Sequence, residues 1–388
     1  MPSFSPASSS SSSGSTHPNA ALINVPGGRH LLDTPALLLD LDGLERNIAR
    51  MAAFVRARGV QLRPHAKSHK SIAIAGRQIA AGAVGVCCAT LGEAETMVGA
   101  GLSGVLITSP IVTDGKIKRL IALAAPGAVM VVVDHPRNVD DLAAAAAHLA
   151  HPLEVLIDFA AGYYRTGAAD ARAVVALARQ IAGYPQLRLR GLQAYAGNIQ
   201  HIEDRHQRSD AAAAVRASIR QVIALATEEN IHFDIVTGAG TGSHDLDAHD
   251  TVFTELQAGS YVFLDGEYSR VLGDGAQPAP FDIALFVQAS VVSVNHPDWV
   301  TIDAGTKVFA TDSGLPAIAD GARPGSHYVF AGDEHGKLVG PASERPELGA
   351  RLEFVTSHCD PTVNLHDVYH VVRGATLVDI WPVDARGR

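Results

Sequence analysis

From about residue 60 to residue 265, short apolar runs alternate with segments that have apolar residues at helical spacing. The runs are apolar on both faces, as in Val129–Val133, which is typical of parallel strands buried between helices. Helical spacing predicts helices at Ala169–Ala182 and Ile202–Glu229, and another that opens at Leu44–Met51. The eight predicted strands are Val60–Arg63, Gly85–Cys88, Gly104–Thr108, Val129–Asp134, Leu153–Asp158, Gly191–Tyr195, Phe233–Thr237 and Gly259–Leu264.

The spacing of these strands sets the expected fold. Successive strands are about 20 to 45 residues apart, which leaves room for a crossover helix in most gaps. Eight strand–helix units in roughly 200 residues favour an α/β fold of the (β/α)8 barrel type. A doubly wound open sheet is the alternative.

The pattern changes after about residue 280, where no long helical period is present. We therefore expect a barrel at residues 41–280 and a β-rich domain at 281–388, which is joined by residues 22–40 through the strand Ala36–Asp40. The strands predicted in the second domain lie between Gly, Pro and Asp turns, at Val287–Val294, Trp299–Ala304, His327–Ala331, Arg351–Thr356, Val368–Arg373 and Leu377–Trp381.

Composition and charge argue against several classes of protein. The 388 residues are 47% hydrophobic and carry a net charge of −9 without a long basic stripe, which argues against nucleic acid as a partner. No apolar run reaches the roughly 20 residues of a membrane span. Three cysteines make no disulfide framework, so we expect a reducing, cytoplasmic location. Residues 1–21 are Ser-rich without an apolar signal core, and we expect them to be disordered.

Candidate chemistry begins with a cationic segment, Arg63-Pro64-His65-Ala66-Lys67-Ser68-His69-Lys70, at the end of the first predicted barrel strand. A lysine crowded by cations and imidazoles is expected to have a lowered pKa, which would make its amine a nucleophile able to form a Schiff base with an aldehyde. A solvated basic face is the alternative interpretation.

Other polar residues follow barrel strands, at the end where parallel barrels place catalytic groups. Arg165 follows the fifth strand, and Tyr195 and His201 follow the sixth. The Gly-rich turn Thr237–Ser243 follows the seventh and is expected to bind a single phosphate. The alternative interpretations are that Arg165 is a surface residue, Tyr195 a core residue and His201 simply exposed, and that the turn is a plain flexible loop.

The β-rich domain contains a second constellation, in which His358 and Asp360 are two residues apart. On an extended segment both side chains would point to one face. A histidine with a carboxylate suits a divalent ion such as Mn²⁺, Mg²⁺, Co²⁺ or Zn²⁺. The alternative is a turn with a satisfied histidine. The polar cluster Asp333–Gly336 is a candidate to support the ligands of this site.

From about Asp33 to Arg388 the chain resembles the D-threonine aldolase group of the fold-type III pyridoxal phosphate enzymes, which share the alanine-racemase-like barrel. The resemblance implies an α/β, (β/α)8 cofactor-binding barrel with a C-terminal β-rich domain. The motifs that carry it are Arg63-Pro64-His65-Ala66-Lys67, Val86-Cys87-Cys88, Gly191-Leu192-Gln193-Ala194-Tyr195, Gln200-His201, Gly240-Thr241-Gly242-Ser243, Glu255-Leu256-Gln257-Ala258-Gly259-Ser260-Tyr261, Asp303-Ala304-Gly305, Asp333-Glu334-His335-Gly336 and His358-Cys359-Asp360-Pro361-Thr362.

The resemblance implies roles for individual residues. Lys67 is similar to the lysine that holds pyridoxal 5′-phosphate as an internal aldimine, with Lys70 the weaker candidate. His201 resembles the general base, and His358 and Asp360 resemble a metal pair, for which Mn²⁺ is the first choice. Arg165 is placed like the arginine that faces the pyridine nitrogen. The residues implied to bind the cofactor are His65, Lys67, Arg165, Tyr195, Gly238, Gly240, Thr241, Gly242, Ser243 and Tyr261.

The implied reaction is retro-aldol cleavage of a D-β-hydroxy-α-amino acid to glycine and an aldehyde, in a homodimer. Alternatives are cleavage of 3-hydroxy-D-aspartate to glycine and glyoxylate, dehydration of D-serine or 3-hydroxy-D-aspartate, and a non-catalytic cofactor-binding homeostasis protein. In the dehydratases the second metal ligand is usually cysteine. Here it is Asp360, and we expect Cys359 to face away, which favours an aldolase. Ala89-Thr90-Leu91-Gly92, Ala196 and Gly266-Glu267-Tyr268 depart from the usual motifs and leave the substrate open, whereas the departure at Ala239 should be tolerated.

Overall fold

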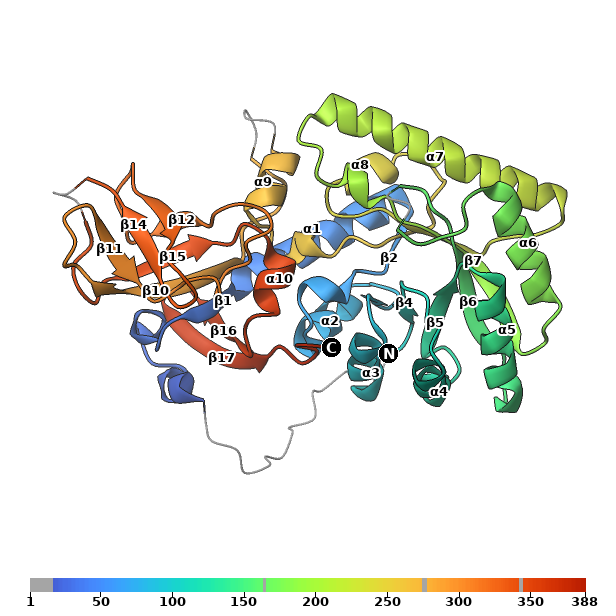
Figure 1. Cartoon of the computed structure of the whole chain (residues 1–388), viewed down its shortest axis with the longest axis horizontal. Coiled ribbons are helices and arrows are strands. Elements are labelled where there is room, and N and C mark those ends of the chain that lie inside the picture. Colours follow the sequence, from blue (N-terminus) through green and yellow to red (C-terminus); the bar gives the residue numbers. More distant parts are fainter. Residues whose placement is uncertain (1–16, 163–164, 274–277, 342–344) are drawn as a thin grey trace.

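In a computed structural model of the chain, the described residues are 17–162, 165–273, 278–341 and 345–388. Figure 1 shows two parts side by side, one with helices around a parallel sheet and one made mostly of β-strands. Among the described residues, no helix combines the length and apolar character that crossing a membrane requires. The tail that we expect to be disordered comprises residues 1–16, which lie outside the described residues, and residues 17–21, which the structure describes.

The first part contains eight short parallel strands in the order β2-β9-β8-β7-β6-β5-β4-β3. The ends of this sheet meet, because His65 and Cys87 form an isolated parallel bridge between the segments of β2 and β3. The strands are β2 (Gln61–Leu62), β3 (Cys87–Cys88), β4 (Val105–Ile107), β5 (Val129–Val133), β6 (Leu153–Asp158), β7 (Leu187–Ala194), β8 (Ile235–Gly238) and β9 (Glu255–Leu256).

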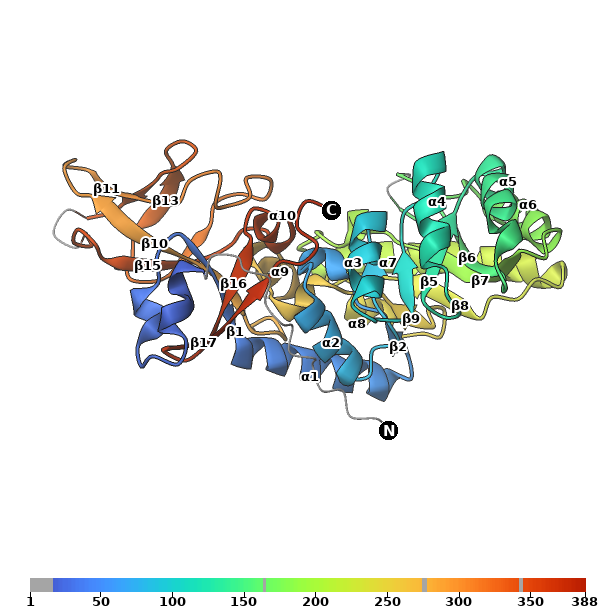
Figure 2. The same ribbon diagram turned by 90° about the horizontal axis from the view of Figure 1, so that it is seen from below.

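Helices surround this barrel, and buried aliphatic side chains such as Val131 and Ile157 fill the space between them and the strands. Figure 2 shows α1 running from the β-rich part to the barrel. The helices are α1 (Leu41–Arg58), α2 (Ile72–Ala80), α3 (Leu91–Gly99), α4 (Asp114–Leu123), α5 (Pro136–Ala145), α6 (Ala171–Ala182), α7 (Arg205–Glu228), α8 (His244–Asp247) and α9 (Gly266–Leu272). Short 3-10 turns lie at η3 (Ala66–Ser68), η4 (Ala146–His148), η5 (Gly197–Ile199) and η6 (Ser260–Val262).

The β-rich part is one mixed sheet of nine strands. The N-terminal strand β1 (Ala36–Asp40) lies inside it, antiparallel to β10 and parallel to β16. This pairing attaches the start of the chain to its end. The other elements are β10 (Leu285–Ser293), β11 (Trp299–Ile302), β12 (Ala317–Asp320), β13 (His327–Phe330), β14 (Gly336–Val339), β15 (Arg351–Val355), α10 (Cys359–Val363), β16 (Val368–Arg373) and β17 (Thr376–Pro382).

The expected fold class is confirmed, and three details of the sequence prediction are wrong. The eighth barrel strand is Glu255–Leu256, whereas the predicted strand Gly259–Leu264 contains η6 and packs on α1. That run is apolar because it is buried, which the pattern alone cannot distinguish from a strand. The short strands β12 and β14 were not predicted. Residues 18–22 form the 3-10 turn η1, where the buried Asn19 contacts His370.

Candidate active site

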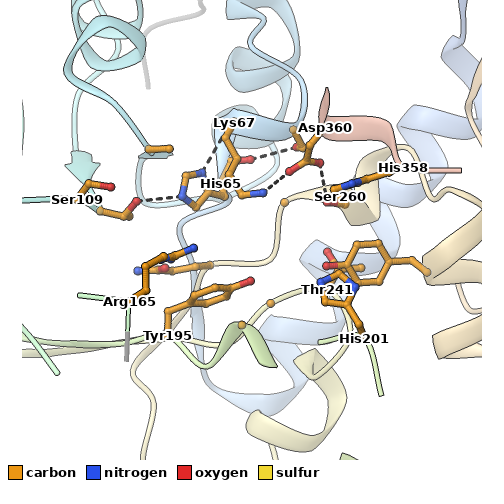
Figure 3. Close-up of a pocket in the computed structure, with 18 of the residues that line it drawn as sticks. His65, Lys67, Ser109, Arg165, Tyr195, His201, Thr241, Ser260, His358 and Asp360 are labelled. Atoms are coloured by element: carbon orange, nitrogen blue, oxygen red, sulfur yellow. Dashed lines mark hydrogen bonds and ion pairs between the residues drawn. The ribbon is translucent and has the colours of Figure 1, made fainter. Parts of the chain in front are cut away.

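A cavity of about 400 Å³ opens at the carboxyl ends of the barrel strands, where the β-rich part meets the barrel. The cavity has the size of a small-molecule site. Figure 3 shows side chains from both parts pointing into it. The predicted site residues that line it are His65, Lys67, Arg165, Tyr195, His201, Gly240, Thr241, His358 and Asp360.

Lys67 lies in the 3-10 turn η3 immediately after β2. The backbone N–H of Lys67 donates to Nδ1 of His65, which caps the turn and points the lysine toward the cavity. Its Nζ donates to Oδ2 of Asp360, from the β-rich part. The Lys67 side chain is 42% exposed, against 10% for Lys70. Lys70 does not line this cavity, because its Nζ is held 2.8 Å from Oε1 of Glu93.

The expected lowering of the Lys67 pKa is wrong. Burial alone would lower this pKa, but the adjacent Asp360 carboxylate outweighs burial and raises it above the usual lysine value. The neighbouring imidazoles add little repulsion, because burial lowers the pKa of His65 to about 3 and that of His69 to about 4. Although burial opposes its ionisation, the Lys67 cation holds the pKa of Asp360 below the usual carboxyl value. Asp360, which is 293 residues away in the sequence, thus reverses the direction of the pKa shift expected from the residues next to Lys67.

Arg165 and Tyr195 form the wall opposite Lys67 (Figure 3). The Arg165 guanidinium carbon lies 5.9 Å from the centre of the Tyr195 ring. The segment after Arg165 is fixed by two hydrogen bonds, from Thr166 Oγ1 to Asp158 Oδ2 (2.7 Å) and from the Gly167 N–H to Asp134 Oδ2 (3.0 Å). Both carboxylates come from the ends of barrel strands, so the barrel itself sets the position of this segment.

The Gly-rich turn contributes Gly240 and Thr241 to the cavity wall. Its glycines are required by packing, because a Cβ on Gly240 would lie 2.5 Å from Oε1 of Gln200 and one on Gly238 would lie 2.3 Å from the Ala194 carbonyl oxygen. Ser243 is fully buried and donates to Asp247, so its hydroxyl does not reach the cavity. Gln200, which sequence reasoning named only as part of a motif and without a role, therefore packs against the turn and holds it in place.

Within the described residues, no acceptor binds the backbone N–H groups of Thr241 and Gly242. Backbone N–H groups without acceptors in a glycine-rich turn suit a phosphate. Together with an accessible lysine in a cavity of this size, they make the site fit pyridoxal phosphate. The turn would hold the phosphate, and Lys67 would hold the aldehyde carbon.

Tyr261 lies differently from the expectation for a cofactor contact. Its ring is fully buried and does not line the cavity at the barrel mouth. Its hydroxyl accepts from Nε2 of Gln78 at 3.2 Å, and its backbone N–H donates to Oγ1 of Thr241 at 3.1 Å. The structure therefore gives Tyr261 an indirect place in the site, as a support for Thr241.

His358 and Asp360 line the cavity together, but the extended segment expected for them is wrong. His358 occupies the N-cap position of α10 without a side-chain capping hydrogen bond, and Asp360 lies in the first turn of that helix. Nδ1 of His358 lies 2.6 Å from Oδ2 of Asp312, and Oδ1 of Asp360 accepts from Ser260 Oγ at 3.1 Å. No residue of the cluster Asp333–Gly336 lines the cavity, and Glu334 pairs with Lys307 on the exposed surface. Sequence reasoning missed Asp312, which stands in no quoted motif, and named Ser260 only as part of a motif, without a role at this pair.

The pair suits an open metal site. In the part of the chain that the structure describes, no group of three or more His, Cys, Asp or Glu side chains is arranged for a metal. Asp312 occupies Nδ1 of His358, so Nε2 of His358 and an oxygen of Asp360 would be available to bind a divalent ion. Burial opposes the charged imidazole, but Asp360 and Asp312 raise the pKa of His358. Cys359 is fully buried and does not line the cavity.

His201 lies across the cavity from Lys67 (Figure 3). It follows η5 in the loop after β7, and its Nδ1 lies 2.8 Å from Oε1 of Glu267 at the start of α9. The ring centre of Tyr268 is 5.7 Å away. Sequence reasoning noted Glu267 and Tyr268 only as departures from a motif, and the structure brings both to His201.

Comparisons with known proteins agree with this geometry. The family model for the alanine racemase N-terminal domain matches residues 39–266, and the model for a putative serine dehydratase domain matches residues 284–372. D-threonine aldolase of Arthrobacter sp. is 42% identical over 92% of this chain and 93% of the relative. 3-Hydroxy-D-aspartate aldolase of Paracoccus denitrificans (strain Pd 1222) is 38% identical, with the same coverage of both chains.

A solved structure extends the comparison to three dimensions. The crystal structure of D-threonine aldolase from Filomicrobium marinum superposes with a TM-score of 0.88 at 42% identity, and the match covers 92% of this chain and 96% of that one. The resemblance drawn from the motifs is thereby confirmed. The chain belongs to the alanine-racemase-like family, in the group of pyridoxal-phosphate-dependent lyases that includes D-threonine aldolase and 3-hydroxy-D-aspartate aldolase.

Proposed function

We propose that this protein cleaves D-β-hydroxy-α-amino acids of the D-threonine type to glycine and an aldehyde, with pyridoxal 5′-phosphate and a divalent metal, Mn²⁺ before Mg²⁺, Co²⁺ or Zn²⁺. One observation carries the proposal: a lysine, a histidine and a histidine–aspartate pair converge on one cavity. These residues are Lys67, His201, His358 and Asp360. Relatives named as D-threonine aldolase support the substrate class.

The chain's own residues divide the work between the two sides of the cavity. Lys67 would hold the cofactor through its amine until the substrate amine takes its place. Arg165 would face the pyridine nitrogen, and a cation there keeps that nitrogen unprotonated. When bound, the cofactor stabilises the electron pair left on Cα as the Cα–Cβ bond breaks.

The opposite side handles the β-hydroxyl. His358 and Asp360 would hold the divalent ion, which lowers the pKa of a hydroxyl that it contacts. His201 lines the same cavity and would accept the hydroxyl proton at Nε2, because Nδ1 faces Glu267. With the proton removed, the oxygen electrons form the aldehyde carbonyl as the Cα–Cβ bond breaks, and glycine is released after Cα is protonated.

A second candidate substrate is 3-hydroxy-D-aspartate, which would yield glycine and glyoxylate. Arg388 lines a depression next to the active site, together with Lys67, His358 and Asp360. A guanidinium there suits the second carboxylate of that substrate. The relative named as 3-hydroxy-D-aspartate aldolase supports this candidate as well.

A panel of D-amino acids tests the proposal on the purified protein loaded with pyridoxal phosphate and Mn²⁺. We expect glycine from D-threonine, loss of activity after EDTA treatment and recovery after Mn²⁺ is added. Glycine from 3-hydroxy-D-aspartate alone would select the second candidate. Pyruvate from D-serine without glycine from either substrate would identify a dehydratase, and full activity after EDTA treatment would remove the metal from the proposal.

Two further properties belong to the same proposal. We expect a homodimer in which the β-rich part of one chain lies near the barrel mouth of the other, and we expect a cytoplasmic enzyme. The three cysteines are buried and unpaired, which agrees with a reducing compartment. Sedimentation of the purified protein measures the oligomeric state, and cell fractionation measures the location.

A further inference from the structure

The Glu267 carboxylate lies partly buried beside the active site and has an unusual set of partners. Its Oε1 lies 2.8 Å from Nδ1 of His201, and its side chain is 17% exposed. Its other oxygen, Oε2, is buried without a hydrogen-bond partner among the described residues. Buried carboxylate oxygens normally have partners. The carboxylate therefore makes its side-chain contact with His201, and its second oxygen gains no stabilising hydrogen bond.

The backbone around Glu267 is fixed to the segment that leads into the metal pair. The Gly266 N–H donates to the Thr356 carbonyl oxygen at 3.0 Å, and the Glu267 N–H donates to that of Ser357 at 3.2 Å. Asp265, which is fully buried, caps α9 at the Tyr268 N–H and also accepts from the Cys359 N–H, both at 2.9 Å. The position of Glu267 is thus tied to α10.

A neutral imidazole carries one proton, on either Nδ1 or Nε2. A carboxylate can only accept, so Glu267 at Nδ1 selects the tautomer with the proton on Nδ1. Nε2 then keeps its lone pair. The ring of Tyr268 beside the imidazole limits its rotation.

We infer that Glu267 is a positioning residue that holds His201 as the Nδ1–H tautomer and so makes Nε2 the proton acceptor. This inference rests on the role of His201 in the proposed function. In the step concerned, the O–H bond of the substrate breaks, its proton forms an N–H bond at Nε2, and the electron pair stays on the oxygen. Glu267 remains a carboxylate hydrogen-bonded to Nδ1–H, and the proton leaves Nε2 for solvent after the aldehyde departs.

The chain offers a matched control for a merely structural role. Glu203, two residues after His201, pairs with Arg270 of α9 at 2.9 Å between Oε1 and Nε. This pair joins the same two segments as Glu267 and His201, but both of its side chains are more than half exposed. If Glu267 only docked the loop on α9, the loss of Glu203 would have a similar effect.

The test compares Glu267→Ala, Glu267→Asp and Glu203→Ala in the full chain. The first readout is the ¹⁵N spectrum of the imidazoles in cofactor-free protein at a pH where His201 is neutral, with His201→Asn used for assignment. We expect the Nδ1–H tautomer in the unmodified protein and a shift toward the Nε2–H tautomer, which free imidazole prefers, in Glu267→Ala only.

The second readout is the steady-state kinetics of D-threonine cleavage by the loaded enzyme. Because the wrong tautomer removes the base while leaving the cavity intact, kcat of Glu267→Ala should fall about 10²–10⁴-fold, with little change in KM. Glu267→Asp should recover part of kcat, and Glu203→Ala should stay near the unmodified value.

Two results would overturn the inference: the Nδ1–H tautomer persisting in Glu267→Ala, or an equal loss of kcat in Glu203→Ala. The spectrum separates this inference from the proposed function. If the unmodified protein cleaves no β-hydroxy amino acid while the tautomer still depends on Glu267, the proposed function fails and the positioning by Glu267 stands.

Discussion

The two halves of the active site are built in different ways. The barrel half consists of segments that follow strands β2, β7 and β8, so one topology brings Lys67, Tyr195 and Thr241 to the same end of the barrel. The half from the β-rich part comes from the start of one helix, where His358 and Asp360 flank Cys359. The comparison teaches that the barrel alone positions the residues proposed to hold the cofactor, whereas the proposed metal pair depends on how the two parts of the chain pack.

Polar contacts join the two halves. Lys67 pairs with Asp360, and Ser260 donates to the same carboxylate. Asp265 accepts from the Cys359 N–H at the start of α10. These contacts cross the boundary between the two parts of the chain at the cavity. Four predictions test how separate the halves are, in order of decreasing expected effect.

The largest effect is expected from Lys67→Ala, which removes the only lysine among the residues that line the cavity. The visible absorption band of the lysine-bound cofactor, at roughly 410–420 nm, should disappear. Activity should fall by about 10³-fold or more. Lys70→Ala is the control and should keep the band, because Lys70 pairs with Glu93 outside the cavity. Loss of the band in Lys70→Ala alone would reassign the cofactor lysine.

Replacing a residue of the proposed metal pair should impair one half of the site and leave cofactor binding by the other half intact. We expect His358→Ala to reduce aldolase activity about 10²–10³-fold and to abolish its dependence on Mn²⁺, while the cofactor band persists. Asp312→Asn should have a smaller effect, of about 10–100-fold on the apparent affinity for Mn²⁺, because Asp312 only orients His358. Absorption spectra and Mn²⁺ titrations measure both. Loss of the cofactor band in His358→Ala would show that the halves are not separable.

Asp360→Asn tests the contact between the halves. The Asp360 charge raises the pKa of Lys67, so its removal should lower that pKa and increase the neutral amine present between about pH 7 and pH 8. Uptake of pyridoxal phosphate by cofactor-free protein should therefore become faster, by about tenfold for each unit of pKa lost. Stopped-flow absorbance over a pH series measures the rate. Slower uptake at every pH would contradict the prediction.

The smallest effect is a pH dependence of stability on the barrel side. Burial raises the pKa of Asp158 from the usual value near 3.8 to about 6, although Gln193 and Thr166 donate to it. The folded state thus holds this proton more tightly than the unfolded state. The stability it contributes is complete below about pH 4 and is lost as the pH rises through about 6.

The neutral Asp158→Asn should therefore match the unmodified protein near pH 4 and exceed its stability above pH 6 by about 1–3 kcal/mol. Chemical unfolding across this range measures the difference, and Asp298→Asn, whose side chain is 75% exposed, is the control. A constant difference at all pH values would show that Asp158 does not titrate in this range.

The local pattern of apolar residues was sufficient to predict most of the barrel strands. Runs such as Val129–Val133 are apolar on both faces because both faces are buried, so periodicity identified seven of the eight strands. The eighth prediction failed at Gly259–Leu264, where burial against α1 produced the same apolar signal without a strand. The motifs also pointed to Lys67, His201, His358 and Asp360, because reactive side chains at strand ends and close spacings can be recognised in the chain itself.

The sequence by itself determined the barrel, the family and the identity of the reactive side chains, because short-range patterns and motifs encode them. Only the tertiary structure decided their charges and partners. Asp360 raises the pKa of Lys67 across 293 residues of chain, and Glu267 meets His201 across two loops. Electrostatic effects depend on distance in space, and a linear sequence does not contain that distance until the two parts of the chain pack together.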